Sequence, residues 1–134
     1  MRIPTAVPPL ALALTIAAAC ATKVALPSRD PEVRGIVTAV TPSEAGETGG
    51  ERLGTLRIEE NPADSSGSPK WVLTITANTI VLVRPGEITE PASFQRLVTG
   101  QRVDAWITGP VRESYPMQAE ASHILVRDST GRAP

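Results

Sequence analysis

QRVDAWIT, residues 101–108, is the stretch that decides the fold class, because its side chains alternate with a period of two. Val103, Ala105 and Ile107 fall on one face, whereas Trp106 falls on the other face together with polar residues. Strict alternation of this kind is typical of a β-strand that packs one face against a core. The stretch therefore predicts a half-buried strand, and the rest of the chain can be placed around it.

Further strands are predicted on both sides of this one from β-branched and alternating patterns, at residues 33–40, 53–60, 71–76 with a continuation over 79–83, and 119–127. Phe94, Leu97 and Val98 have the i, i+3, i+4 spacing of one helical face, which predicts a short helix within residues 91–98. Five strands with a helix between the third and the fourth are typical of a small Greek-key barrel of the OB type. We therefore expect an all-β fold with one short helix, a five-stranded OB-like barrel. A β-sandwich is the alternative, although sandwiches usually need about seven strands.

The first residues predict an export signal that ends at Cys20, the only cysteine. Arg2 is followed by an apolar run over residues 10–19, which is shorter than the roughly 20 residues that span a bilayer. A cysteine directly after small residues resembles the lipobox of bacterial lipoproteins. This resemblance implies a diacylglycerol on the thiol and a lipid anchor on the extracytoplasmic side of the bacterial cell envelope. Cleavage by an ordinary signal peptidase after Ala19 is the alternative, and it would leave a free thiol.

The chain divides into four parts. We expect residues 1–19 to be the signal peptide and residues 20–32 to be a flexible tether, since the latter contain Pro27 and Pro31 and no sustained periodicity. Residues 33–128 form the barrel, and residues 129–134 form a frayed tail. The formal net charge of −1 comes without runs of like charge, so it indicates no dedicated polyanion partner.

The second half of the barrel resembles the YobA-like bacterial domains of unknown function. The matching elements are Leu-x-x-Gly-Gln-x-Val at 97–103, Gly-Pro at 109–110, Glu-Ser-Tyr-Pro-x-Gln at 113–118 and Ala-x-x-Ile at 121–124. The resemblance implies a small OB-like domain, frequently carried on a lipoprotein, with no established activity and no catalytic residues to transfer to this chain.

The candidate ligand or partner surface combines two predicted features. The first is the loop from Glu113 to Gln118, in which Tyr115 would lie across the barrel end, either as a structural plug or as a recognition loop. The second is the polar face of residues 101–108, where Arg102 accompanies Trp106. An indole on a polar face indicates either a sugar, peptide or partner site, or a side chain that caps the barrel.

Catalytic, metal and nucleic-acid sites find little support in the sequence. His123 is the only histidine, which excludes a metal site built from several imidazoles, and Ser114 lacks the Gly-x-Ser-x-Gly elbow of a strained nucleophile. The loop before residue 53 is acidic, which disfavours nucleic acid. We expect no catalytic residue, no metal and no cofactor. The predicted function is a membrane-tethered, non-enzymatic binding or accessory module for an envelope protein, peptide or glycan; the alternatives are a secreted structural domain without a ligand and, last, a hydrolase.

Overall fold

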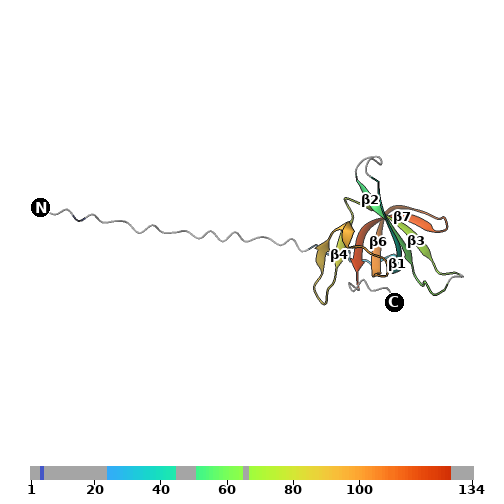
Figure 1. Ribbon diagram of the computed structural model, residues 1–134, viewed down its shortest axis with the longest axis horizontal. Coiled ribbons are helices and arrows are strands. Elements are labelled where there is room, and N and C mark those ends of the chain that lie inside the picture. The colour runs from blue at the N-terminus through green and yellow to red at the C-terminus, as the bar shows by residue number, and fades with distance from the viewer. Residues whose placement is uncertain (1–3, 5–23, 45–50, 65–66, 128–134) are drawn as a thin grey trace.

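The computed structural model describes residue 4 and residues 24–44, 51–64 and 67–127; Cys20, nearly all of the predicted signal and the predicted tail lie outside the described residues. The described part is built from strands and one short helical turn (Figure 1). The elements are β1 (Val33–Pro42), β2 (Arg52–Glu59), β3 (Lys70–Thr76), β4 (Ile80–Val83), β5 (Glu90–Ala92), the 3-10 helix η1 (Phe94–Arg96), β6 (Arg102–Arg112) and β7 (Met117–Val126). No helix in the described part is long and apolar enough to cross a membrane.

Five of the strands close into a barrel. β1 pairs antiparallel with β2 and with β6, β2 pairs antiparallel with β3, and β6 pairs antiparallel with β7. A parallel pairing of β3 with β7, in which Trp71 opposes Met117, joins the two ends of the sheet. Closure removes the exposed strand edges that would otherwise template aggregation. This arrangement confirms the predicted OB-like, five-stranded barrel.

β4 and β5 extend the sheet beyond the barrel. The sequence predicted strand over residues 79–83, which β4 confirms, but it counted these residues as a continuation of the preceding strand, and that was wrong. A turn separates the two, with the Thr79 amide donating to the Thr76 carbonyl at 3.1 Å, and β4 then runs parallel to β7. β4 is apolar throughout because both of its faces are buried: Val81 contributes to the barrel core, and Leu82 packs in a separate cluster on the outside.

The segment predicted as a short helix is mostly extended. β5 takes up its first residues, and only Phe94–Arg96 form a single 3-10 turn. Phe94 and Leu97 are buried as their spacing predicts, whereas Val98 is 42% exposed. One turn is enough to place both side chains on the core, so no longer helix is needed.

Two apolar clusters lie on opposite sides of β6. The inward residues Val103, Ala105 and Ile107 belong to the barrel core, which confirms the predicted division of this strand into two faces. Trp106 points outward and forms a second cluster with Leu82 and Leu125. The outer surface of the barrel at β4, β6 and β7 is therefore apolar and needs a cover.

Residues 24–32, here called the strap, provide that cover. The sequence predicted a flexible tether over residues 20–32, but Val24 and Leu26 pack against the outer cluster. The indole Nε1 of Trp106 donates to the carbonyl oxygen of Arg29 at 2.8 Å. The pairing of β1 with β6 starts only at Val33, so the backbone of β6 beyond that point has no strand partner on this side.

Side chains of the strap satisfy that backbone. The amide of Ile107 donates to Glu32 Oε2 at 3.0 Å, and the guanidinium of Arg29 donates to the Ile107 carbonyl at 2.7 Å. Arg29 and Glu32 also form an ion pair at 2.9 Å. Backbone groups inside a fold require partners of this kind. The strap is thus attached to the barrel by apolar packing and by specific hydrogen bonds.

Candidate functional site

A cleft of about 510 Å³ lies beside the β6–β7 hairpin, on the outer face of the sheet. We call it the hairpin cleft. Its lining is largely polar and consists of Arg52, Thr74, Thr108, Gly109, Pro110, Arg112, Gln118, Ala119 and Glu120. β2, β3, β6 and β7 therefore all contribute to one concave surface.

Strand register explains why these residues meet. Thr74 on β3 opposes Glu120 on β7, and Glu120 opposes Thr108 on β6, so the three side chains form a row across the sheet. Farther along the hairpin, Arg112 opposes Gln118. The register shifts between Thr108 and Arg112, which leaves three residues of β6 in an outward bulge. Bulges of this kind bend a strand and redirect its side chains.

The bulge begins at Gly109, which has a φ of +73°. A residue with a side chain rarely adopts this left-handed conformation, so glycine is required for the chain to turn here. Pro110 follows and fixes the next φ. The Gly-Pro dipeptide seen in the sequence therefore forms one wall of the hairpin cleft.

Two arginines give the hairpin cleft its charge. Arg52 comes from the start of β2, and Arg112 comes from the end of β6; both side chains are exposed. Within the part of the chain that the structure describes, neither forms an ion pair, and Glu120 is the only acidic residue of the lining. Two guanidinium groups are thus available to an anionic group in the cleft.

The loop of the β6–β7 hairpin adds an aromatic ring next to this surface. Tyr115 is 71% exposed, and Lys70 Nζ lies 5.9 Å from the centroid of its ring. Lys70 also lies 4.0 Å from Glu59 on β2. Ser114 Oγ donates to the Pro116 carbonyl at 2.8 Å, which fixes the loop. The hydroxyphenyl ring is therefore held beside the outer face of β3.

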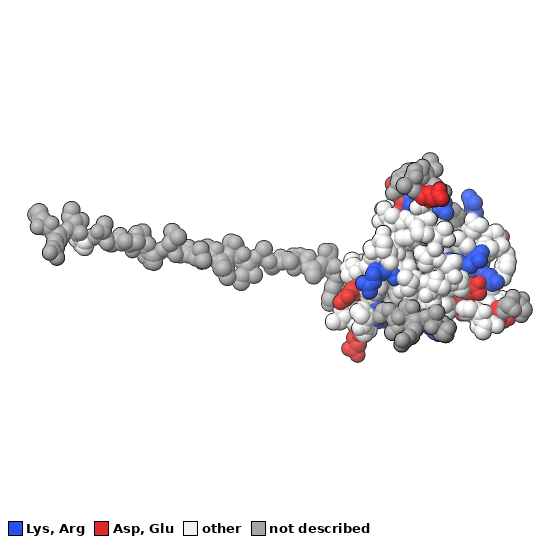
Figure 2. All heavy atoms as spheres, viewed as in Figure 1, with Lys and Arg blue, Asp and Glu red and all other residues white. Residues whose placement is uncertain are grey.

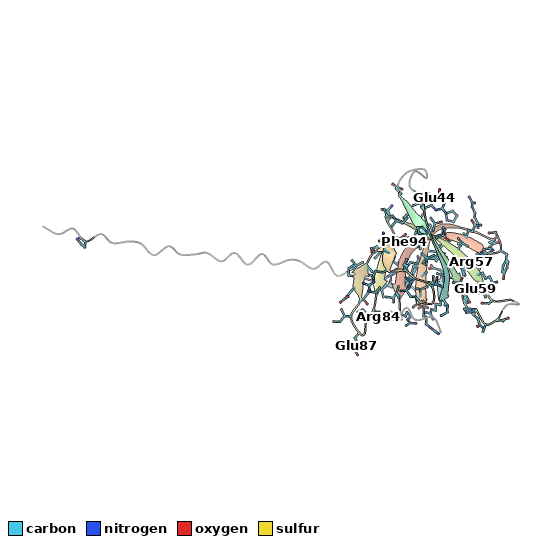
Figure 3. The ribbon with its side chains drawn as sticks, viewed as in Figure 1. Glu44, Arg57, Glu59, Arg84, Glu87 and Phe94 are labelled. Carbon is cyan, nitrogen blue, oxygen red and sulfur yellow. The ribbon has the colours of Figure 1, made fainter. Side chains whose placement is uncertain are left out.

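The same side of the barrel carries further charged side chains. Arg57 and Glu59 of β2 lie close together, far from Arg84 and Glu87 in the β4–β5 hairpin (Figure 3). Lysines and arginines alternate with acidic residues across the visible surface, without a large area of one sign (Figure 2). On the face shown, therefore, positive charge is not concentrated in one area.

The residues predicted as a ligand surface do not all meet. Gln118 lines the hairpin cleft, and Glu113 and Tyr115 lie in the adjoining loop. Arg102 lies elsewhere, in a smaller cleft of about 250 Å³ with Arg34 and Arg127, among others.

Trp106 is separate from both clefts. It is 4% exposed because the strap covers it, and its ring makes an edge-on contact with His123, with centroids 6.3 Å apart. Its place is in the outer apolar cluster.

Arg52, Thr74 and Arg112 are members of the cleft that sequence reasoning did not select. Arg112 follows the Gly-Pro dipeptide closely, and that adjacency was the one available signal. Arg52 and Thr74 reach the cleft only through the pairing of β2 with β3 and of β3 with β7.

His123 is the described residue whose proton affinity the fold changes clearly. Burial, with a smaller contribution from the nearby Arg29, lowers the pKa of His123 below its usual value of 6.5. Burial has this effect because it disfavours the charged imidazolium. No group of three or more His, Cys, Asp or Glu side chains within the described ranges is placed to hold a metal ion.

Comparison with known proteins identifies a family for this chain. The model of a family described as a protein of unknown function, DUF3221, matches residues 56–126, from within β2 to the end of β7. No curated protein and no solved structure matches the chain. The matched range contains Arg112, Gln118 and the whole β6–β7 hairpin.

Proposed function

We propose that this chain, which belongs to the DUF3221 family of proteins of unknown function, is a non-enzymatic binding module that takes an acidic peptide or glycan in the hairpin cleft. The observation that carries the proposal is the pair of unpaired guanidinium groups, those of Arg52 and Arg112, on one concave surface of the described structure. OB-type barrels bind oligosaccharides and oligonucleotides on the same side, at the second and third strands and the loop between the last two. Fold alone does not establish function, so the proposal depends on these side chains.

The chemistry of the lining suits a carboxylate-bearing polymer. A guanidinium presents several donors in a planar fork that matches a carboxylate. Thr74 and Gln118 add neutral hydrogen-bonding groups, and the ring of Tyr115 provides an apolar surface against which a sugar ring or a peptide side chain can lie. A hydrogen bond to a charged group contributes roughly 1.5–3 kcal/mol, so each arginine accounts for about one to two orders of magnitude in affinity.

Binding can be tested with polymers that differ in charge. Polygalacturonate and polyglutamate serve as acidic probes, and dextran serves as the neutral glycan in isothermal titration or a sedimentation assay. We expect binding of at least one acidic polymer and none of dextran, with a loss of about tenfold or more for Arg112→Gln and for Arg52→Gln. Arg96→Gln is the matched control, since Arg96 is exposed and lies outside the lining of the cleft. Equal binding by all three variants would reject the site.

We further infer that the module is held at the extracytoplasmic face of a bacterial membrane by acylation of Cys20. Support comes from the sequence, in which a short apolar run and small residues lead directly to the only cysteine. Cys20→Ala should move the chain from the membrane fraction to the soluble fraction, because each buried CH₂ of an acyl chain contributes about 0.8 kcal/mol. Intact mass of the membrane-extracted chain distinguishes the possibilities: a diacylglyceryl addition supports the anchor, whereas an unmodified thiol or a retained leader rejects it.

A further inference from the structure

The strap shortens the connection between Cys20 and the barrel. If residues 20–32 were free, thirteen residue steps would separate Cys20 from Val33, a reach of up to about 45 Å. The strap is fixed to β6 and to the outer cluster from Val24 onward, so four steps remain, which reach at most about 14 Å. An anchor at Cys20 would hold the barrel directly against the bilayer.

The position of Val24 determines which side of the barrel faces the lipid. Val24 packs over the cluster formed by residues of β4, β6 and β7, together with Ile80 at the start of β4. β4 leads into the β4–β5 hairpin, whose loop is residues 84–89. Ile88 in this loop is only six residues along the chain from Leu82, so it lies within about 20 Å of a member of the cluster that the strap covers.

Ile88 is unusually exposed for a large aliphatic side chain. Its exposed fraction is 72%, the highest among the large apolar residues of the described structure. An aliphatic side chain on a hairpin loop gains free energy when it enters the boundary between headgroups and acyl chains. Glu87 and Glu90 flank it at close range, so the loop suits a zwitterionic lipid surface and not a strongly anionic one.

We propose that the strap and the β4–β5 hairpin form the membrane-facing side of the molecule, with Ile88 in contact with lipid and the hairpin cleft directed away from the bilayer. Val83, which leads into the β4–β5 loop, pairs with Val126 at the end of β7, whereas the hairpin cleft takes Gln118, Ala119 and Glu120 near the start of the same strand. Figure 1 likewise places β4 on the side away from β3. This inference rests on the acylation of Cys20 proposed above.

The chain offers a direct test, because an acylated Cys20 leaves no free thiol. Ile88→Cys then provides a unique labelling position, and Glu113→Cys in the loop at the hairpin cleft is the matched control. Each variant is extracted from membranes, labelled with an environment-sensitive nitrobenzoxadiazole dye and reconstituted into phosphatidylcholine vesicles. We expect about a twofold rise in emission and quenching by doxyl-labelled lipid at position 88, since burial in the interface removes the dye from water. Neither change is expected at position 113. Identical behaviour of the two positions in vesicle-bound protein overturns the proposed orientation.

The experiment distinguishes a chain that is not acylated at Cys20 from an acylated chain that faces the membrane with another side. A chain that is not acylated takes up a second dye at Cys20 and does not float with the vesicles, and this outcome overturns both proposals. Insertion of twelve Gly and Ser residues between positions 23 and 24 tests the strap itself, because it adds about 20 Å of flexible reach. The lengthened chain should still float with the vesicles but lose most of the quenching at position 88. Undiminished quenching would show that the strap does not set the orientation.

Discussion

Replacement of Trp106 by alanine measures how strongly the strap is integrated into the domain. The indole is 4% exposed, packs with Leu82 and Leu125, and donates from Nε1 to the Arg29 carbonyl at 2.8 Å. Truncation of a buried tryptophan costs about 3–5 kcal/mol, and the loss of the hydrogen bond is part of the same change. Small domains are stable by roughly 5–15 kcal/mol, so the variant should lose a large fraction of its free energy of unfolding.

Urea unfolding followed by far-ultraviolet circular dichroism provides the measurement. Trp106→Phe is the matched control, since phenylalanine retains most of the apolar contact but removes the Nε1 donor; it should cost about 1–2 kcal/mol. A loss below about 1 kcal/mol for the alanine variant would contradict this reasoning, because it would mean that the indole is not packed under the strap.

Three further perturbations have defined outcomes. Gly35→Ala should lower the free energy of unfolding by roughly 1–3 kcal/mol, because a Cβ there would clash with the backbone carbonyl of Glu59 on β2. Gly67→Ala, with open space around it, should leave the free energy of unfolding unchanged in the same denaturation experiment. The lowered pKa of His123 means that the folded state binds the imidazole proton less well than the unfolded state does. The contribution of His123 to stability should therefore be complete above pH 6.5 and fall as the pH drops below that value. If the melting temperature of a His123→Gln variant falls as steeply between pH 7 and pH 5 as that of the unchanged protein, His123 is not the origin of the pH dependence. Glu32→Ala removes the acceptor for a backbone amide of β6 and should cost about 1–3 kcal/mol, and unchanged urea unfolding would refute that role.

The barrel could be predicted from the sequence because its strands alternate and follow one another in the OB order. The faces of residues 101–108 were assigned correctly from the period alone, since Val103 and its alternate neighbours enter the core. β4 could not be placed in this way. Its four residues are uniformly apolar, so they carry no period, and its partner β7 lies about forty residues away in the chain.

The strap was missed for a related reason. Prolines and charged residues interrupt it, and a segment that lies on the outside of a sheet needs neither a period of two nor one of 3.6. Only Val24 and Leu26 indicate an apolar contact, and their partners come from three different strands.

Of the residues that the sequence selected as a candidate surface, one lines the hairpin cleft. The Glu113–Gln118 loop could be selected because its sequence is distinctive, and Gln118 does line the cleft. Arg52 could not be assigned, since it reaches the cleft only through strand pairings that the sequence does not encode locally. Arg102 and Trp106 fall on the same face of the alternating pattern. Arg102 nevertheless lies in the smaller cleft, whereas Trp106 lies in the outer apolar cluster under the strap.

The convergence of β3, β4 and β6 on β7 has a consequence for biogenesis. β7 follows its three partner strands in the chain, so the barrel cannot close until residue 126 has left the ribosome. Contacts between such distant parts of a chain form slowly, because loop-closure entropy must be overcome before the pairing stabilises anything. A strand that follows all of its partners in the chain thus postpones closure of the barrel until the whole β-sheet has been synthesised.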